Sequence, residues 1–548
     1  MPLQIAIHDK AYAWLEPLDE ASVTHHTASQ KAAQVLGGVV FMVSVLLAVL
    51  ALFLFFMTSL GDLFLIETWF EASWRTEVLY VSILGFCYLF AHQKIIASNV
   101  AHMPKQKDDF VIGEPVALTE EAINMADLFI DESRTSVETA HFLARKFGHA
   151  QVDPLHLFVG ALESAQASIA LGRLGIKFDV LKDPISRRLQ GRQLGDTTVL
   201  SDETEKVLLK ALAKSYDQGL DAVHPLEILA AAFEVEEFVQ ELFLENDISV
   251  DQFENMAEWI RINERMRTRY LRFRKAAGFK PTGAMNRAMT SVATPLLDAY
   301  SEDLTTAGVN GRLPMLVGRD KEIEEVFRVI EGGGQSVVLV GPEGVGKTSV
   351  LAGIAQLMVE ERVPDILKDN RLVRLSLPHL VSGASKPEAQ ERLLRLFVEV
   401  NKSRNIILAV TDLEEIGELA SSFVDFLKRS GTFAIATTTP RAYTASIERS
   451  VLGRIFQKVD INEPDETMAI RMLESKVGGI EYGQKVIFSY DAVEKAVQLS
   501  DRYMHEMYLP KKAIMVASEA ALYASKTKGQ DALVTGEDIA QIVTEKTG

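Results

Sequence analysis

The sequence predicts three parts in order: an N-terminal transmembrane helical hairpin, an all-α domain built from a duplicated unit, and an α/β domain that ends in a helical lid. Three observations lead to this prediction. Two apolar runs lie near the N-terminus, a helical segment is echoed about 70 residues later, and a buried strand leads into a glycine-rich loop and a helix. The chain has 548 residues, which is long enough for several such units.

Composition narrows the class of protein. The formal net charge is −18, so the chain lacks the basic balance of a general nucleic-acid binder, and no nucleic-acid partner is expected. Its one cysteine, Cys87, excludes a disulfide framework or a thiolate metal cluster. Apolar residues make up 48% of the chain, so sizeable cores are expected.

The two apolar runs predict a membrane anchor at residues 35–97. Val35 to Leu60 carries no charge over roughly 26 residues, enough to span a hydrocarbon core of about 30 Å. Its start lies too far into the chain, and the run is too long, for a simple signal peptide. The second run, Val78 to Ala91, is shorter and is followed by His92, Gln93 and Lys94. We interpret it as a second span, with an interfacial or re-entrant segment as the alternative.

The residues around these runs set the expected orientation. The stretch between them is acidic and contains aromatic residues of the kind that favour membrane interfaces. Lysines flank the pair, namely Lys31, Lys94, Lys105 and Lys107. Because basic residues favour the inner face, we expect an integral protein of the cytoplasmic membrane with both ends inside. Residues 1–34 are then a cytoplasmic segment, and the later domains lie in the cytoplasm.

The duplicated unit occupies residues 115–262. Val152 to Leu162 reads VDPLHLFVGAL, and Val223 to Phe233 reads VHPLEILAAAF. A proline stands near the start of each copy, where a first-turn proline opens a helix. Two such copies predict two similar units packed as one helical domain. His149 and His156 are expected to be packing and capping positions rather than metal ligands.

A basic linker follows at residues 263–296. Arg261 to Lys280 contains eight Lys or Arg and one Glu, with aromatic residues between them. It is suited to lie against anionic lipid, at about 1 kcal/mol per basic residue near the surface. The alternative is a solvated linker helix, or one that pairs with the acidic remainder of the chain.

The α/β domain is expected at residues 297–460, with the helical lid at 461–548. A buried strand, Ser336 to Val340, is followed by GPEGVGKT and then by the helix Ser349 to Met358. This is the context that a phosphate-binding loop requires, because its backbone N–H groups and the helix N-terminus attract phosphates. We predict that this loop binds ATP with Mg²⁺ through Gly341, Pro342, Glu343, Gly344, Val345, Gly346, Lys347, Thr348 and Ser349. Lys347 would reach the β and γ phosphates, and Thr348 would ligate Mg²⁺.

In this combination the motifs resemble the Clp family of AAA+ unfoldases. The duplicated pattern is similar to the family's N-terminal domain, which receives protein substrates and adaptors. Leu297 to Ile323 looks like the family's entry segment, which implies that Val317 and Gly318 lie beside the adenine. The resemblance also implies a homo- or hetero-hexameric ring.

The resemblance extends to three later segments of the α/β domain and lid. Thr432 to Thr439 looks like the sensor strand, with Thr438 as the polar residue that senses the γ-phosphate. Val451 to Pro464 is similar to the arginine-finger segment, with Arg454 as the finger. Ser500 to Ala521 resembles the lid, which implies that three residues lie near the base and phosphates: Pro510, Lys512 and Ala513.

Departures from the family pattern put hydrolysis in doubt. The family's acidic pair aligns with Thr411 and Asp412, so Asp412 remains for Mg²⁺ while the glutamate that polarises water has no clear counterpart. If the strand ran one residue longer, Leu413 would stand at the position of that base. Glu414 or Glu415 is the alternative source of a carboxylate. General-base assistance contributes typically 10²–10⁴-fold, so its loss would leave binding with slow turnover.

Other positions depart in the same direction. Arg454 is followed by Ile455 where the family has a second arginine, and the segment around Ser385 carries no substrate-gripping aromatic residue. The sequence also shows no second ring module and no peptidase-docking tripeptide in the ring module. His505-Glu506 lacks the second histidine of a zinc protease, so the chain is not expected to be a protease by itself.

Three hypotheses about function follow. The first is an ATPase that remodels or unfolds proteins at the cytoplasmic membrane face. The second is a scaffold, adaptor or regulatory subunit that binds ATP but barely hydrolyses it. The third is a subunit of a mixed ring that lends Arg454 to a competent neighbour.

Overall fold

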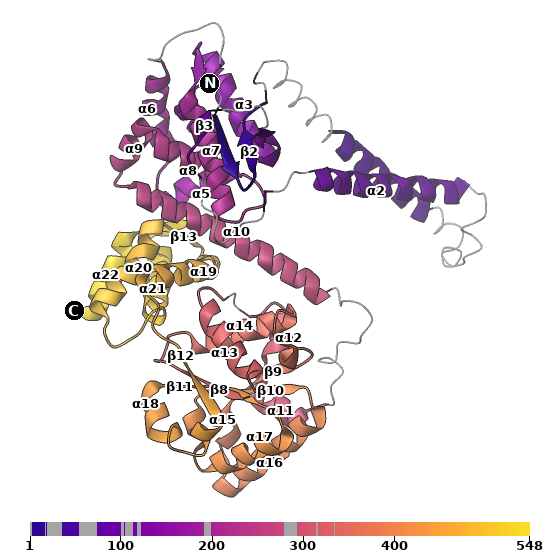
Figure 1. Ribbon diagram of the computed structural model, residues 1–548, viewed down its shortest axis with the longest axis vertical. Helices are drawn as coiled ribbons and strands as arrows, with labels where there is room; N and C mark the ends of the chain where they lie inside the picture. The colour runs from indigo at the N-terminus through magenta and orange to yellow at the C-terminus, as the bar shows by residue number, and fades with distance from the viewer. Residues whose placement is uncertain are drawn as a thin grey trace. The chain divides into compact units, whose positions relative to one another are not determined.

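The computed structural model describes most of the chain (Figure 1). The described residues are 3–16, 18, 35–53, 74–99, 103–104, 113–117, 122–190, 199–278, 293–313, 316–333 and 335–548. Their contacts divide the chain into two units, one of Met1–Gly172 with Ile176–Glu254 and one of Arg173–Gly175 with Asn255–Gly548.

Two apolar helices form the predicted hairpin region. The first helix, Val35–Phe53, is the one helix among the described residues that is long and apolar enough to cross a membrane, and 11% of its most apolar window is buried. The second, α2 (Trp74–Asn99), has a shorter apolar part, Thr76–Ala91. The predicted hairpin therefore contains one helix of full spanning length rather than two. The end of the first run at Leu60, the acidic stretch after it, and Lys31, Lys105 and Lys107 lie outside the described residues.

The duplicated unit folds as two helix pairs. The first pair is α3 (Asp131–Lys146) with α4 (Pro154–Leu162), and the second is α7 (Asp202–Asp217) with α8 (Pro225–Val235). As predicted, the prolines occupy the first turns of α4 and α8. The remaining helices of this region are α5 (Ala165–Leu174), α6 (Phe178–Gln190), α9 (Glu237–Leu244) and α10 (Val250–Gly278).

Reciprocal contacts lock the two copies together. Strand β5 (Gln151–Val152), before α4, pairs in parallel with β6 (Val199–Leu200), before α7. Phe129, before α3, bridges in the same way to Val223, before α8. The hydroxyl of Ser133 donates to the carbonyl of Val223 at 2.7 Å, and the hydroxyl of Thr204 donates to that of Val152 at 2.5 Å. The duplication is therefore one domain and not two independent units.

The histidines of the first copy are structural. His156 is fully buried, and its Nδ1 accepts the backbone N–H of Asp153 at 3.0 Å, which closes a capping box at the start of α4. His149 Nδ1 and His156 Nε2 share a hydrogen bond of 2.9 Å. The prediction that both are packing and capping positions is confirmed.

Sequence reasoning missed a small sheet in this unit. Strands β1 (Leu3–Ile7), β2 (Lys10–Ala13), β3 (Val116–Ala117) and β4 (Ile123–Asn124) lie in the order β3-β1-β2-β4. The N-terminal residues, predicted as a cytoplasmic segment, thus form two strands beside α7.

The α/β domain has one six-stranded sheet in the order β12-β8-β11-β10-β9-β7. All neighbouring strands are parallel except the edge pair β7 and β9. The strands are β7 (Ser301–Asp303), β8 (Ser336–Val340), β9 (Arg371–Leu375), β10 (Ile406–Val410), β11 (Ala434–Thr438) and β12 (Phe456–Asp460). Every residue of β8, β10 and β11 is buried, as expected of central strands covered on both faces.

Helices cover both faces of the sheet and build two apolar cores. One core includes side chains of α13 (Asp320–Glu331) and α14 (Lys347–Val359). The other includes α16 (Lys386–Ser403) and α17 (Ala420–Ser430). Shorter helices are α11 (Pro295–Tyr300), α12 (Leu304–Val309), α15 (Leu377–Val381) and α18 (Pro440–Ala442).

The C-terminal lid is helical, as predicted (Figure 1). Its helices are α19 (Glu466–Gln484), α20 (Tyr490–Tyr503), α21 (Lys511–Lys528) and α22 (Gly536–Thr547), and β13 (Val486–Phe488) pairs in parallel with β14 (Ala532–Val534). Asp465 and Ser489 cap α19 and α20 by accepting backbone N–H groups, which explains where those helices begin.

Candidate nucleotide-binding site

The phosphate-binding loop lies at the carboxyl end of β8, where α14 begins. Gly344 and Gly346 have φ of 84° and 107°, a conformation that glycine adopts without steric cost. A Cβ on Gly341 would lie 2.3 Å from the carbonyl oxygen of Ile461, so this position also requires glycine. Gly346 caps α14, whose N-terminus carries a partial positive charge. The loop has the backbone form that phosphate groups need.

Lys347 provides a half-buried positive charge over this loop. Its ammonium group donates to the carbonyls of Gly341 at 2.6 Å and Pro342 at 2.8 Å. Burial lowers the pKa of Lys347, and the nearby carboxylates of Asp412 and Glu414 act to raise it. The lysine therefore faces both the loop and the acidic residues that follow β10.

The acidic segment directly follows β10, which ends at Val410 as predicted. Leu413, which would stand at the position of the base if the strand ran one residue longer, is fully buried in the apolar core. Asp412 is exposed and has φ of 53° and ψ of 60°, in the left-handed region. Its N–H donates to the hydroxyl of Thr437 at 3.3 Å.

Glu414 is the acidic residue that contacts the sensor position. The hydroxyl of Thr438, at the buried end of β11, donates to Glu414 Oε2 at 2.7 Å. Glu415 is further out, and burial together with the charges of Asp412 and Glu414 raises its pKa. The structure thus places Asp412 and Glu414 near Lys347, and of the two alternative glutamates it is Glu414 that contacts Thr438.

The residues present fit a phosphate ligand with Mg²⁺. Thr348 is exposed in the first turn of α14, directly after Lys347, and Ser349 follows it. Among the described residues no group of three or more His, Cys, Asp or Glu side chains forms a metal site. A cation here would therefore depend on phosphate oxygens in addition to Thr348 and Asp412, which is how Mg²⁺ is usually held beside a nucleotide.

The entry segment is tied to the loop by a buried arginine. Arg319 donates to the carbonyls of Val345 and Asn462, both at 2.9 Å. Next to it, Gly318 has φ of 72°, and a Cβ there would lie 2.0 Å from Met468 Sδ in the lid. Val317 and Gly318 are half-buried, and Gly318 lies against Met468 of the lid.

Two neighbouring lysines of the lid, Lys511 and Lys512, have different partners, and only Lys512 was predicted to lie near the nucleotide. Lys512 is buried and pairs with Asp501 at 2.7 Å and with Glu463 at 3.6 Å, while Pro510 and Ala513 are buried beside it. The neighbouring Lys511 instead reaches the loop, where it pairs with Glu343 at 2.7 Å. The Lys511 side chain also packs closely against Gly344, because a Cβ added to this glycine would lie only 2.5 Å from Lys511 Cδ. In the sequence, the only sign of this contact is that Lys511 is the first residue of the helix α21.

Arg454 lies at the other edge of the sheet. It is exposed and ends a short helical turn just before β12, whose first residue, Phe456, pairs with Ser336 at the start of β8. Lys347 follows the opposite end of β8. Because five residues of strand span about 16 Å, Arg454 does not reach its own phosphate-binding loop. The predicted finger role of Arg454 would therefore require a neighbouring subunit.

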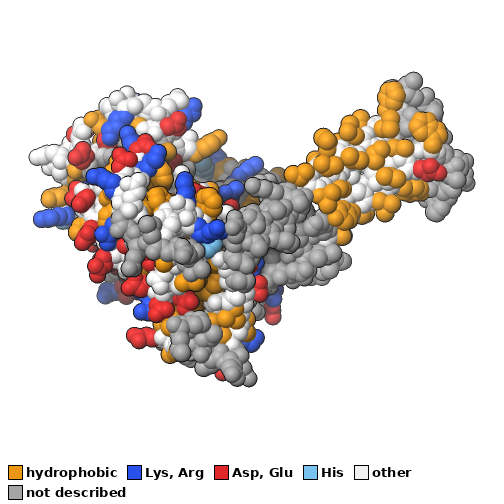
Figure 2. Space-filling model, turned by 90° about the horizontal axis from the view of Figure 1, so that it is seen from above, with side chains coloured by type: hydrophobic (Ala, Val, Ile, Leu, Met, Phe, Trp, Pro, Cys, Tyr) orange, Lys and Arg blue, Asp and Glu red, His pale blue; other side chains and the backbone are white. Residues whose placement is uncertain are grey.

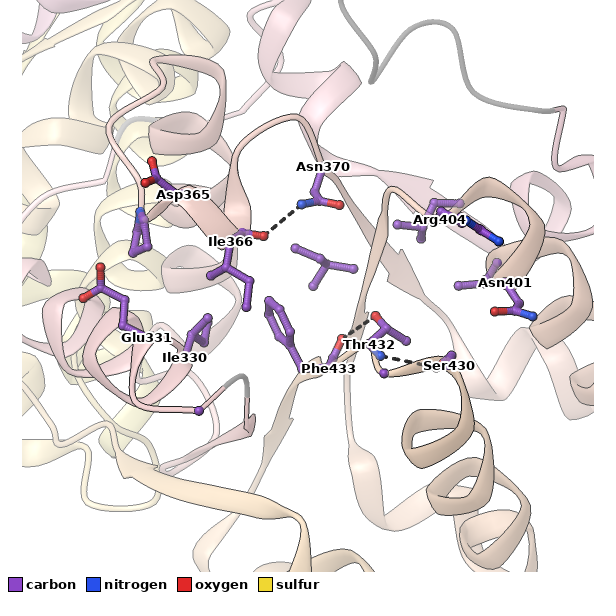
Figure 3. Close-up of a pocket in the computed structure, with 16 residues that line it drawn as sticks. Ile330, Glu331, Asp365, Ile366, Asn370, Asn401, Arg404, Ser430, Thr432 and Phe433 are labelled. Atoms are coloured by element: carbon purple, nitrogen blue, oxygen red, sulfur yellow. Dashed lines mark hydrogen bonds between the residues drawn. The ribbon is translucent and has the colours of Figure 1, made fainter.

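A cavity of about 1050 Å³ also lies at the amino ends of the strands (Figure 3). Its lining includes Asn370, just before β9, Ile406, the first residue of β10, and Phe433, just before β11. It is therefore at the edge opposite the phosphate-binding loop and is not the nucleotide site.

Comparisons with known proteins find matches for three parts of the chain. Residues 129–246 match the model of the Clp repeat (R) N-terminal domain. Residues 337–462 match the ATPase family associated with various cellular activities (AAA), and residues 465–546 match the AAA lid domain. The chain thus carries three matched parts in order: a Clp repeat domain, an AAA module and an AAA lid domain.

Individual relatives are longer than this chain. The negative regulator of genetic competence ClpC/MecB of Bacillus subtilis is 27% identical over 408 residues, which cover 72% of this chain and 48% of the relative. The chaperone protein ClpB of Pseudomonas putida is 29% identical over 415 residues, covering 72% and 46%. The ATP-dependent Clp protease ATP-binding subunit ClpC of Staphylococcus aureus is 34% identical over 247 residues, covering 43% and 30%. The chain spans about half the length, or less, of these relatives.

Among solved structures, the Hsp104–ADP complex of Saccharomyces cerevisiae matches with a TM-score of 0.44 and 26% identity. The match covers 46% of this chain and 45% of that chain.

Proposed function

We propose that this chain is a membrane-anchored Clp-type AAA+ protein that binds ATP with Mg²⁺ and remodels or unfolds other proteins at the cytoplasmic membrane face. One observation carries the nucleotide part of the proposal. The glycine cradle at Gly341 to Gly346 holds Lys347 opposite Asp412 and Glu414, inside a chain that matches Clp repeat, AAA and AAA lid families.

Each residue of the site has a role in this proposal. The backbone N–H groups of the loop and Lys347 bind the phosphates, and Thr348 and Asp412 hold Mg²⁺, which neutralises phosphate charge when bound. Glu414, held by Thr438, accepts a proton from the attacking water, a role that the alignment left without a residue. Arg454 acts across a subunit boundary, which requires a homo- or hetero-oligomeric ring, for which the family's hexamer is the model.

The second candidate is an ATP-binding scaffold, adaptor or regulatory subunit with little or no turnover. The observation in its favour is the segment after β10, where Thr411 replaces the first acid and Asp412 has left-handed backbone angles. In a mixed ring, such a subunit would still supply Arg454 to a competent neighbour. In each case the Clp repeat domain is the proposed receptor for substrates or adaptors.

The test is ATP binding and phosphate release by the full chain in lipid nanodiscs. Lys347→Ala is the variant, and Lys368→Ala is the control because that lysine pairs with Asp365 on a helical turn before β9, away from the loop. We expect Lys347→Ala to abolish binding and Lys368→Ala to preserve it. Binding without phosphate release above the Lys347→Ala background would select the scaffold, and absence of Lys347-dependent binding would overturn both readings.

The membrane anchor is supported by the helix Val35–Phe53, whose mean hydropathy is 2.8 and which is mostly exposed. Apolar side chains cover much of the visible surface of this helix and α2 (Figure 2). Such a surface is unfavourable in water and favourable among lipid chains.

A further inference from the structure

The small sheet in the first unit joins strands from both sides of the apolar helices. Strands β1 and β2 precede the helix Val35–Phe53, and β3 and β4 follow α2. Gln4 in β1 pairs with Val116 in β3, and Tyr12 in β2 pairs in parallel with Ile123 in β4. The chain therefore leaves this sheet, passes through both apolar helices and returns to the same sheet.

The N-terminal strands are also part of the helical domain. The N–H of Leu3 donates to the carboxylate of Glu205 on α7 at 2.7 Å. His8 and Tyr216 share a hydrogen bond of 2.7 Å. Trp14 is buried and meets the ring of Phe129 edge-on, at 5.3 Å between centroids. Removing these strands from the domain would expose a closely packed surface.

The return from α2 to the domain is short. The helix ends at Asn99, and the N–H of Met103 donates to the carbonyl of Asp221 at 3.1 Å. Four residues of extended chain reach about 14 Å at most. The domain therefore lies within about that distance of the end of α2.

The two apolar helices pack through small and polar residues. The hydroxyl of Ser82 donates to the carbonyl of Ser44 at 2.9 Å, and both serines are buried. A Cβ on Gly85 would lie 2.0 Å from Ser44 Oγ, so glycine allows the close approach. Large apolar side chains face outward instead, with Leu46 exposed by 62% and Leu84 by 67%. Small residues inside and large apolar ones outside are typical of helix pairs in lipid.

We infer that the two helices cross the bilayer together as one packed hairpin, and that the sheet β3-β1-β2-β4 fixes both of its ends on the same side. A single crossing would place β1 and β3 on opposite sides, where they cannot pair. The helix Val35–Phe53 is about 28 Å long, close to the hydrocarbon thickness. The apolar part of α2, Thr76–Ala91, is about 24 Å long, so the crossing of α2 also uses residues that flank this part of the helix. The Clp repeat domain is then held at the membrane surface, where it meets partners that are themselves in or on the membrane.

This inference rests on the membrane anchoring in the proposed function, and cysteine labelling separates the two. The chain carries Cys87→Ser, which removes its own cysteine, and one new cysteine at Lys10→Cys, Glu203→Cys or Glu67→Cys. Lys10 and Glu203 are exposed, in β2 and α7, and Glu67 lies between the two helices in sequence. A membrane-impermeant maleimide is applied to intact cells and to inside-out vesicles.

We expect Lys10→Cys and Glu203→Cys to react only in the inside-out vesicles and Glu67→Cys only in intact cells. Labelling of Lys10 and Glu203 from opposite sides would overturn the role of the sheet. Labelling of all three from one side would overturn the crossing. Release of the protein by alkaline carbonate without detergent would instead overturn the anchoring itself, and leave ATP binding to be judged separately.

Cross-linking tests the packing within the membrane. In the Cys87→Ser chain, Ser44→Cys with Ser82→Cys should form a disulfide on oxidation, because the two positions are in contact. Ser44→Cys with Leu84→Cys is the matched control, since Leu84 faces outward. Equal cross-linking of both pairs, or of neither, would overturn the packed hairpin.

Discussion

Removing the Thr438 hydroxyl should slow ATP hydrolysis while leaving ATP binding nearly unchanged. That hydroxyl donates a 2.7 Å hydrogen bond to Glu414 Oε2 and holds the carboxylate at the carboxyl end of β11. A hydrogen bond to a charged group contributes about 1.5–3 kcal/mol. If that contribution is lost only in the transition state, Thr438→Val should lower kcat roughly 10- to 150-fold. Glu414→Gln, which removes the base itself, should lower it about 10²–10⁴-fold.

The assay is steady-state phosphate release by the full chain in nanodiscs, with the Kd for ATP measured in parallel. Thr439→Val is the matched control, because that neighbouring hydroxyl caps α18 and accepts the N–H of Ala442. The double variant Glu414→Gln with Thr438→Val should be no slower than Glu414→Gln alone, since the threonine acts through the carboxylate.

Two results would refute this reasoning. Turnover within about twofold of wild type in both Thr438→Val and Glu414→Gln, with Asp412→Asn inactive, would make Asp412 the base. Equal effects of Thr438→Val and Thr439→Val would reduce the hydrogen bond to a structural contact.

Three further predictions concern other parts of the second unit. Asp412→Gly should raise Tm, because a non-glycine residue in the left-handed region costs about 1 kcal/mol or more, and it should weaken Mg²⁺-dependent ATP binding. The control Asp369→Gly, at φ of 59°, should raise Tm without affecting ATP binding. A loss of ATP binding in Asp369→Gly would contradict the assignment of Asp412 as a Mg²⁺ ligand. Arg454→Ala should lower ATP hydrolysis by about 10³-fold or more, and mixing it with Lys347→Ala subunits should restore part of the activity, because the intact finger then meets an intact loop; failure to complement would argue against action across subunits. Burial raises the pKa of Glu474 from 4.5 to about 8, so the folded state binds the proton of this carboxyl group more tightly than the unfolded state does. The contribution of this group to the free energy of unfolding is therefore fully present below pH 4.5 and is lost as the pH rises towards 8. Glu474→Gln should flatten the fall of Tm over this range, and a parallel fall in both proteins would exclude Glu474 as its cause.

Local patterns made much of the second unit predictable. The strand Ser336–Val340, the loop after it and the helix that begins at Lys347 form from consecutive residues, and their roles depend on backbone geometry that glycine spacing reveals. In the first unit, the helix pairs of the repeat were also predictable from neighbouring residues, because Pro154 and Pro225 mark the starts of helices.

The acidic side of the site was not predictable in the same way. The alignment left Glu414 and Glu415 as equal alternatives, since neither occupies the family's position. The turn of the backbone at Asp412 and the buried Leu413 direct Glu414 to Thr438, which is 24 residues away in sequence. This choice depends on the packing of β10 beside β11.

The sequence by itself determined which chemistry this chain carries: a phosphate-binding loop, a duplicated helical domain and two apolar helices, each specified by neighbouring residues. Only the tertiary structure decided which distant groups meet. It brought Glu414 rather than Glu415 to Thr438, and it brought Lys511 rather than Lys512 to Glu343 in the loop. It also paired Gln4 with Val116, which both apolar helices separate in sequence. The physical reason is that glycine turns and hydrophobic periodicity are local properties, whereas strand pairing and side-chain contacts join residues far apart in the chain and leave no periodic signal in either partner.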